Sequence, residues 1–328
     1  MLYTIIMFPM GLILLFFQAL CVRSCLRVYK LTRSHDLMRK NETCPDAWKP
    51  FIRPPGHLLH PLHVALWRAI TTAPLRYIAI LSVLIITTTS TAFLSPKAGL
   101  YIAHIGGRIV AYLVGVTKTR FVGAPASAGE APLIVVNHVS WVDFIVLAAT
   151  TEFGFVMSEA VSNAPIVGPG FTRLALKVGS VILDRGEVKS REAAKEKIGV
   201  RLNTLLREKM GERLMIFPEG TLTSGEYLVP FKLGFFATLP PVQPLRLEFS
   251  NPHYSLSDLG TLEGTAFFLC LDSTELLFTW GDVVAPVKGD TPETLAERAR
   301  TELVRGSNIK LSMVGSFRDH KSLFAASD

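Results

Sequence analysis

Residues 133–143 read LIVVNHVSWVD, and this stretch joins a strand signal to polar side chains that could carry chemistry. The run LIVV is short, apolar and rich in β-branched residues, which predicts a buried strand over 133–136. The polar residues follow at once, and a helical pattern, WVDFIVLAA, comes next. Ligands of open α/β sheets usually bind in the loops at the carboxyl ends of strands. The stretch therefore predicts a strand, a turn and a helix, with a candidate site in the turn.

His138 and Asp143 are the chemically significant pair in this turn. Five residues turn a helix through about 500°, so the two side chains would not share a face of one continuous helix. They can meet only if His138 precedes the helix and Asp143 lies in its first turn. The carboxylate would then accept one imidazole N–H and leave the other nitrogen free as a base. A purely structural interpretation fits as well, because Ser140-x-x-Asp143 is a capping box. Spacing alone leaves both interpretations open.

A second polar loop follows the apolar run LMIF at 214–217, which also predicts a buried strand. Its sequence from Phe217 is FPEGTLTSG. Turn chemistry explains the proline and the glycines without any function. It does not explain Glu219, since an acid directly after a buried strand must find a partner or water. Hydroxyls and exposed backbone N–H groups in this loop could hold a phosphate.

Three other features are weaker. The run SVIL at 180–183 predicts a strand that ends in Asp184 and Arg185, which could be an ordinary ion pair or a bidentate phosphate site. Lys232 lies beside an aromatic residue on a loop, where lysines are mostly solvated. Residues 242–244, VQP, fit a strand interrupted by prolines.

The order of elements indicates an α/β layer structure, because short buried strands alternate with helical patterns. Residues 190–210 predict a helix with an apolar face. Thr291-Pro292-Glu293 predicts another helix start, with proline at the first position.

Composition points to a membrane. The 328 residues are 49% hydrophobic and only 19% charged, whereas soluble domains carry about 25% charged residues. These values exclude a disordered protein and disfavour a purely soluble enzyme. The four cysteines have no metal-ligand spacing. The net charge of +7 suits an anionic membrane surface or nucleic acid, but aromatic–basic interleaving typical of nucleic-acid binders is missing.

Two uncharged runs could enter a bilayer. Residues 1–22 are long enough to cross and are followed by positive charge, which indicates an uncleaved anchor and not a signal peptide. The second run, 77–96, ends in a Thr/Ser cluster. Residues 23–76 between them hold ten Lys/Arg and three Asp/Glu, so the positive-inside rule makes this segment cytosolic. The apolar segment 100–116 carries His104 and Arg108, which indicates an interfacial or core helix.

Four motifs in this order resemble the membrane-bound glycerolipid acyltransferase family, which includes 1-acylglycerol-3-phosphate and lysophosphatidylcholine acyltransferases. The family pattern is N-H-x4-D, G-x-[IV]-x-x-[DE]-R, F-P-E-G-T-x-S and a hydrophobic V-x-P segment. This sequence has NHVSWVD at 137–143, GSVILDR at 179–185, FPEGTLTS at 217–224 and VQP at 242–244. The N-H-x4-D motif alone is a weak signal, but it is strong when FPEGT follows. The extra Thr223 before Ser224 departs from the pattern and looks like the lysophosphatidylcholine branch.

The resemblance covers roughly residues 95–305. It implies an α/β fold with a mixed central sheet flanked by helices and preceded by hydrophobic membrane helices. It also implies transfer of a fatty acyl group from acyl-CoA to the free hydroxyl of a lysophospholipid. The acceptor would be lysophosphatidic acid, or lysophosphatidylcholine or lysophosphatidylethanolamine, in phospholipid synthesis or remodelling. No metal or cofactor is implied, and acyl-CoA is a co-substrate.

The family roles extend to individual residues of this chain. His138 would be the general base and Asp143 would stabilise the imidazolium. Glu219 would hold a glycerol hydroxyl or a basic side chain. The substrate-binding residues would be Asn137, Arg185, Glu219, Gly220, Thr221 and Lys232.

We expect an integral membrane protein of the endoplasmic reticulum whose active site faces the cytosol. Because the basic segment and the acyl-CoA site should both be cytosolic, we expect 77–96 to lie in the leaflet or to re-enter it without crossing. A non-catalytic membrane or lipid-droplet scaffold on the same domain is the alternative function. The expected parts are an anchor (1–22), a basic cytosolic loop (23–76), a membrane-embedded or interfacial region (77–116), an acyltransferase domain (117–305) and a C-terminal tail (306–328).

Overall fold

The structure is a computed structural model of the whole chain. It describes all residues except 1, 42–43, 54–61, 152, 159–162, 164–167, 178, 184–187, 209–212, 256–259, 317–318, 320 and 323–328.

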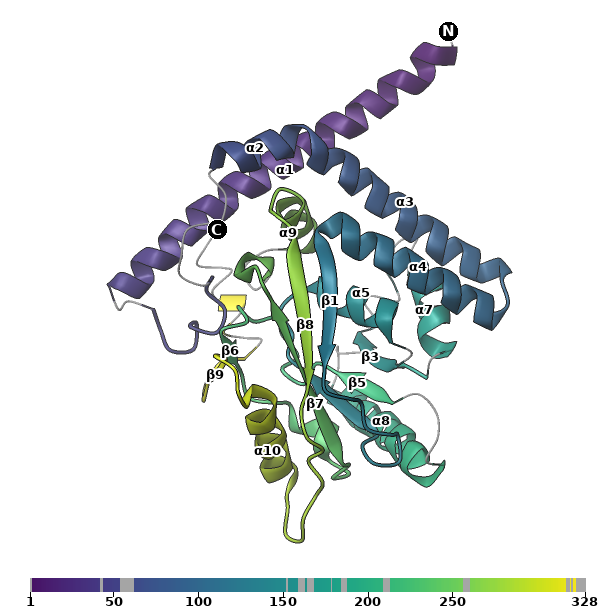
Figure 1. The fold of residues 1–328 in the computed structure, drawn as a ribbon, viewed down its shortest axis with the longest axis vertical. Helices are drawn as coiled ribbons and strands as arrows, with labels where there is room; N and C mark the ends of the chain where they lie inside the picture. The colour runs from purple at the N-terminus through teal and green to yellow at the C-terminus, as the bar shows by residue number, and fades with distance from the viewer. Residues whose placement is uncertain are drawn as a thin grey trace.

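A seven-stranded mixed sheet forms the centre of the molecule (Figure 1). Its strand order is β1-β8-β7-β2-β5-β3-β4. All neighbouring pairs are parallel except β7 and β8, which are antiparallel. The strands are β1 (Val116–Val122), β2 (Leu133–Val136), β3 (Gly154–Ser158), β4 (Val181–Leu183), β5 (Leu214–Ile216), β7 (Val242–Phe249) and β8 (Thr274–Trp280). Two short strands, β6 (Tyr227–Leu228) and β9 (Lys310–Leu311), pair separately.

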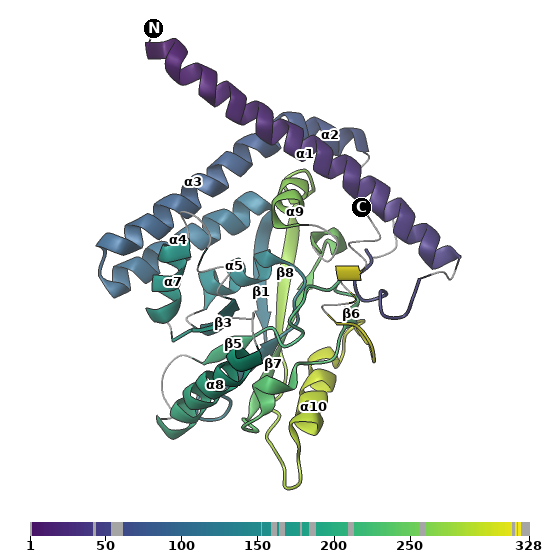
Figure 2. The same cartoon turned by 180° about the vertical axis from the view of Figure 1, so that it is seen from behind.

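Helices cover the sheet on both faces and extend from its upper end (Figures 1 and 2). They are α1 (Leu2–Lys40), α2 (Leu62–Ile70), α3 (Thr72–Phe93), α4 (Pro96–Val114), α5 (Trp141–Thr150), α7 (Gly168–Lys177), α8 (Val188–Glu208), α9 (Thr261–Phe268) and α10 (Pro292–Val304).

Strand β2 explains why the sheet needs cover on both faces. Successive side chains of a strand point to opposite faces, and all four residues of LIVV are buried. Ile134 and Val136 pack into a core shared with α4, α5 and α9. Leu133 and Val135 pack into a second core shared with α8 and α10. A strand buried on both faces reads as a continuous apolar run, which is the signal that predicted it.

The predicted strands and helices of the α/β region are confirmed within two residues at each end that the structure describes. β2 has the predicted bounds, and β4 and β5 are each one residue shorter. α8 begins at Val188, two residues before the predicted start. The side chain of Thr291 caps α10, as its sequence predicts. VQP lies within β7, and Pro244 does not interrupt the strand because its carbonyl still pairs with Gly281.

The N-terminal region differs from the expected anchor and loop. α1 continues past Val22 to Lys40, so the first part of the expected loop 23–76 is helical. The physical reason is the absence of Gly and Pro between residues 12 and 44, since these are the residues that interrupt helices. Ion pairs fix this half of α1 to the α/β region: Arg23 and Arg27 bind Glu263 of α9.

Helices α3 and α4 form an antiparallel hairpin that packs against α5 and α7. The hairpin closes tightly, because a β-carbon at Gly106 of α4 would lie 2.2 Å from Thr87 Oγ1 of α3. In the Thr/Ser cluster of α3, the Thr88 and Thr89 hydroxyls donate to carbonyls one turn back. Among the described residues, two helical segments are long and apolar enough to cross a membrane, Met10–Lys40 and Thr72–Ser90.

The C-terminal segment 306–328 departs from the expected tail. Strand β9 at Lys310–Leu311 pairs in parallel with β6. Backbone pairing with β6 therefore fixes this part of the segment.

Candidate active site

The candidate site lies where the loops after β2 and β5 meet. These strands are parallel neighbours, so their carboxyl ends lie at the same edge of the sheet. His138 follows β2, and Phe217 follows β5. The two rings stack, with centroids 4.0 Å apart and planes inclined by 17°. The two loops that the sequence singled out therefore form one site.

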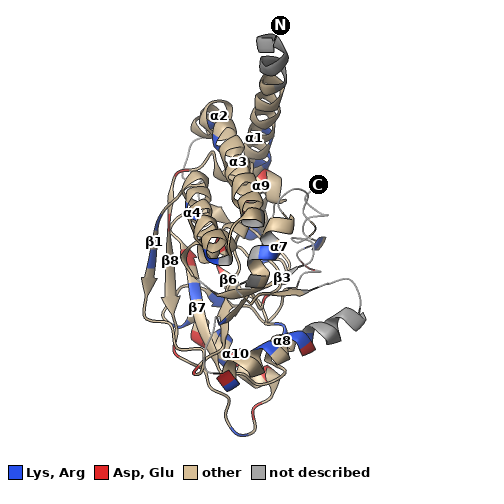
Figure 3. Ribbon diagram, turned by 90° about the vertical axis from the view of Figure 1, so that its right-hand side faces the viewer, with Lys and Arg blue, Asp and Glu red and all other residues tan. Residues whose placement is uncertain are grey.

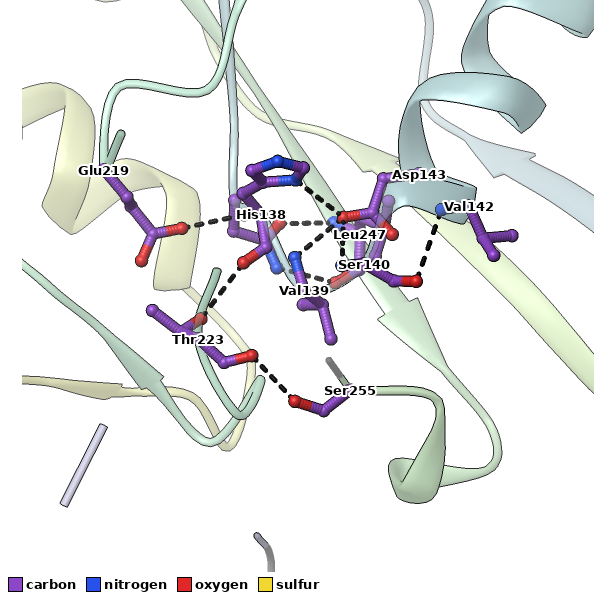
Figure 4. A network of polar contacts seen from close by, with 10 residues as sticks. His138, Val139, Ser140, Val142, Asp143, Glu219, Thr223, Leu247 and Ser255 are labelled. Carbon is purple, nitrogen blue, oxygen red and sulfur yellow. Dashed lines mark hydrogen bonds and ion pairs between the residues drawn. The ribbon is translucent and has the colours of Figure 1, made fainter. Parts of the chain in front are cut away.

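His138 and Asp143 meet in the geometry that their spacing allowed. His138 precedes α5 and Asp143 is in its first turn, with 3.1 Å between His138 Nδ1 and Asp143 Oδ2. The Asp143 side chain is buried, whereas the His138 side chain keeps 22% of its surface exposed. Figure 4 shows one imidazole nitrogen directed at Asp143 and the other directed away from it. With the proton assigned to Nδ1, Nε2 is left with a free lone pair.

Asp143 is held rigidly by the turn that it caps. Its Oδ2 also accepts the backbone N–H groups of Val139 and Ser140, at 2.7 and 2.9 Å. The Ser140 hydroxyl accepts the N–H of Val142 in return and completes the capping box. One carboxylate oxygen thus has three contacts at the N-terminus of α5, two from backbone N–H groups and one from the imidazole. The capping box and the His138–Asp143 contact are therefore present together.

Glu219 fixes the backbone of His138. Its Oε1 accepts the His138 N–H at 2.8 Å, and its Oε2 accepts the Val229 N–H at 3.3 Å. The side chain is buried. Burial raises the pKa of the Glu219 carboxyl to about 8, although both N–H groups and Arg300 act to lower it. Both carboxyl oxygens of Glu219 are thus engaged by backbone N–H groups, and its expected contact with a glycerol hydroxyl or a basic side chain stays a prediction.

Asn137 is likewise engaged by backbone. Its Nδ2 donates to the Leu247 carbonyl and its Oδ1 accepts the Leu247 N–H, at 2.9 and 2.8 Å. The side chain is buried and fastens the loop after β2 to β7. Both polar atoms of the Asn137 side chain thus bind the backbone, and its expected contact with substrate stays a prediction.

The remaining predicted residues lie around the second loop. Gly220 adopts φ +65, and a β-carbon there would lie 2.2 Å from Lys232 Nζ. The exposed Lys232 ammonium therefore lies directly over the Gly220 backbone. Thr221 is buried beside them. Arg185 lies outside the described residues.

Sequence reasoning missed two residues that fix the other side of His138. Thr223 donates both its N–H and its hydroxyl to the His138 carbonyl, at 2.9 and 3.3 Å. The Ser255 hydroxyl donates to the Thr223 carbonyl at 2.9 Å (Figure 4). Thr223 was noted only as a departure from a motif, and Ser255 carries no signal of its own in the sequence.

An apolar cavity of about 80 Å³ lies between the α3–α4 hairpin and α5. Phe144 and Ile145, which directly follow Asp143, contribute to its wall. Ala103 of α4 and Met157 of β3 lie on other sides of it. The cavity therefore lies against α5, the helix whose first turn contains Asp143.

Comparison with known proteins agrees with this geometry. Residues 118–248 match the Acyltransferase family model. Lysophospholipid acyltransferase LPEAT1 of Arabidopsis thaliana is 30% identical over 189 residues, which are 56% of this chain and 46% of that protein. Lyso-ornithine lipid O-acyltransferase of Pseudomonas aeruginosa is 38% identical over 132 residues, which are 37% of this chain and 46% of that protein. The chain thus spans less than half the length of these curated relatives.

A solved structure shares the fold. It is the 1-acyl-sn-glycerophosphate acyltransferase PlsC from Thermotoga maritima, with a TM-score of 0.51 and 18% identity over 71% of this chain and 92% of that one. At this identity the likeness concerns the fold alone. The family model and the sequence relatives therefore indicate an acyltransferase domain over residues 118–248 that is similar to those of lysophospholipid acyltransferases.

Proposed function

We propose that this protein transfers a fatty acyl group from acyl-CoA to the free hydroxyl of a lysophospholipid. The observation that carries the proposal is the partly exposed imidazole of His138, oriented by a buried carboxylate 3.1 Å away. An oriented imidazole with one free nitrogen is the arrangement that general-base catalysis requires. The names of the sequence relatives support a lysolipid as the acceptor.

The proposed reaction follows from this geometry. His138 Nε2 takes the proton of the acceptor hydroxyl as its oxygen attacks the thioester carbonyl, and Asp143 stabilises the imidazolium that forms. The carbon–sulfur bond then breaks, and coenzyme A leaves as a thiolate that can take the proton back from His138. The products are a phospholipid with a new ester and free coenzyme A. The reaction needs no metal or cofactor.

The acceptor head group would bind beside the second loop. The Lys232 ammonium over Gly220 offers positive charge at the mouth of the site, and a lysine is a common point-charge partner for phosphate. Thr221 adds a hydroxyl at the same loop. Arg185 stays a proposed phosphate partner on its motif alone. Lysophosphatidic acid, lysophosphatidylcholine and lysophosphatidylethanolamine all offer the required phosphate and hydroxyl.

The apolar cavity is suited to the end of the acyl chain. It is lined by side chains such as Ala103, Phe144 and Met157 and lies against α5, the helix that carries Asp143. Burial of methylene groups stabilises a bound chain by about 0.8 kcal/mol for each group. We assign the cavity to the distal part of the acyl group that is transferred.

A membrane location with the site on the cytosolic side, as in the endoplasmic reticulum, is part of the proposal. Residues 10–16 of α1 project from the body with large apolar side chains exposed, and α3 is almost free of charge (Figure 3). α1 and α3 pass each other near α2 and run in clearly different directions (Figures 1 and 2), so the two helix axes cannot both lie along the bilayer normal. Arg27 pairs with Glu263 and Arg39 pairs with Glu226. These contacts support a basic segment and an α/β region on one side of the membrane, with α1 crossing and α3 in the leaflet.

A panel assay tests the proposal. Purified protein in detergent or vesicles would be given labelled oleoyl-CoA with each lysophospholipid named above, with lyso-ornithine lipid and with monoacylglycerol. We expect transfer to at least one phosphorylated lysolipid with stoichiometric release of coenzyme A. Transfer to none of them by folded protein would favour the scaffold function.

A further inference from the structure

Arg300 is a buried arginine on α10, beyond the region that matches the family model. Its guanidinium is 2% exposed. Nη2 donates to the Leu228 carbonyl at 2.6 Å and also to the Ser312 carbonyl, and Nη1 contacts Glu297 at 3.1 Å. A charged group is costly to bury unless it is fully engaged. The proposed reaction has so far used none of these contacts.

The peptide unit between Leu228 and Val229 connects Arg300 to the active site. Arg300 binds its carbonyl, and the N–H of the same peptide donates to Glu219 Oε2 at 3.3 Å. Hydrogen bonds to both ends of one peptide polarise it in the same sense and strengthen each other. The guanidinium therefore fixes the plane and position of the group that holds Glu219.

Glu219 passes this constraint to His138. Its other oxygen accepts the His138 N–H at 2.8 Å. The series from Arg300 through the 228–229 peptide and Glu219 to His138 consists of three hydrogen bonds, of which the first two are buried and the last is partly buried. Asp143 orients the imidazole ring and holds the peptide that follows His138 through the Val139 N–H, whereas the N–H of His138 itself is held by Glu219.

We propose that Arg300 is a positioning residue for His138, acting through the 228–229 peptide and the Glu219 carboxyl group. This inference rests on the proposed role of His138 as the base. Without Arg300 the Leu228 carbonyl still accepts one hydrogen bond, from the Ser312 N–H. The 228–229 peptide can therefore tilt while this loop stays folded. A small displacement of a catalytic group lowers the rate of the chemical step more than substrate binding.

Arg213 provides the matched control. It is also buried, and it also binds a backbone carbonyl, that of Ala131, at 2.7 Å and Gln243 at 2.9 Å. It precedes β5, at the end of the strand opposite the candidate site. Arg213→Met therefore removes a comparable buried guanidinium and leaves intact the hydrogen bonds that connect Arg300 to His138.

The test compares Arg300→Met, Arg300→Lys and Arg213→Met for kcat, both KM values and Tm in the full-length protein. We expect Arg300→Met to lower kcat about tenfold with both KM values within twofold, since misplacement affects the chemical step. Arg300→Lys keeps the charge and an N–H donor but loses the planar, rigid guanidinium that fixes the direction of the Nη2 hydrogen bonds, so its kcat should fall between those of wild type and Arg300→Met. Arg213→Met should lower Tm and leave kcat of the folded protein unchanged.

A double-mutant cycle with Glu219→Gln gives an independent readout. Residues that act through one link are not additive, so Arg300→Met should lower kcat little further when Glu219→Gln is already present. Wild-type kcat in whichever Arg300 variant folds, or full additivity in the cycle with either variant, would overturn the proposal. Wild-type activity of His138→Ala would instead overturn the proposed function, which separates the two failures.

Discussion

His138 Nδ1 lies 3.1 Å from an Asp143 oxygen that also accepts the N–H groups of Val139 and Ser140. One carboxylate oxygen thus caps α5 and orients the imidazole. The cap fixes Asp143 before any substrate binds, which is the preorganisation that a catalytic pair needs. The position of His138 is fixed as well, because Glu219 holds its N–H and Thr223 holds its carbonyl.

Asn137→Ala should destabilise the protein without weakening substrate binding. The substitution removes two hydrogen bonds to Leu247 and leaves buried backbone groups without partners, which costs about 2–3 kcal/mol. Thermal unfolding and steady-state kinetics on the folded variant would measure both effects. A tenfold rise in the lysolipid KM with unchanged Tm would restore Asn137 as a substrate ligand.

Glu219→Gln should change the pH dependence of stability. Burial raises the pKa of Glu219 from 4.5 to about 8, so between these values the folded protein holds a proton that the unfolded chain has released. The resulting contribution to wild-type stability is complete below pH 4.5 and is lost as pH rises to about 8, by about 1.4 kcal/mol per pH unit. The neutral glutamine lacks this dependence.

Urea unfolding of both proteins at pH 5 to 9 measures this effect. The free energy of unfolding of wild type should fall relative to that of the variant up to about pH 8 and then run parallel to it. Parallel curves over the whole range would show that the Glu219 pKa is not raised by folding.

Ala103→Leu should shorten the preferred acyl donor. The larger side chain would occupy the cavity of about 80 Å³ beside α5, and excluding one or more methylene groups from an apolar site changes kcat/KM by roughly tenfold or more. Competition assays should show a loss with oleoyl-CoA and none with octanoyl-CoA. Ala124→Phe, on an exposed loop, is the control, and equal losses with both donors would argue against the assignment of the cavity.

Topology can be read from the chain's own sequence. Asn41-Glu42-Thr43 is a glycosylation sequon, which is modified only in the secretory lumen. With α1 crossing and α3 in the leaflet, Asn41 should stay unmodified in a eukaryotic cell. A tag after Asp328 should be digested by protease added to sealed microsomes. Glycan on Asn41 would contradict the cytosolic position of the basic segment, and a protected tag would mean that α3 crosses.

Strands β2, β4 and β5 and the His138 turn could be predicted because their signals are local. LIVV shows its burial directly, and the spacing of His138 and Asp143 allows only one way to meet. The partners of Glu219 could not be predicted, because the His138 N–H is 81 residues away and comes close only when β2 pairs with β5. The full length of α1 was not predicted, because the basic residues after Val22 indicated a loop between membrane segments. No Gly or Pro interrupts the helix there.

The central claim is that His138 is the base, and one measurement tests it most directly. Acyl transfer from labelled oleoyl-CoA to the best lysophospholipid of the panel would be compared for wild type, His138→Ala and Asp143→Asn, with Tm recorded for each. General-base catalysis contributes about 10²–10⁴-fold to the rate, so His138→Ala should lose about 10³-fold in kcat while remaining folded. Asp143→Asn should also lose kcat while remaining folded. His138→Ala with kcat within a few-fold of wild type would contradict the account.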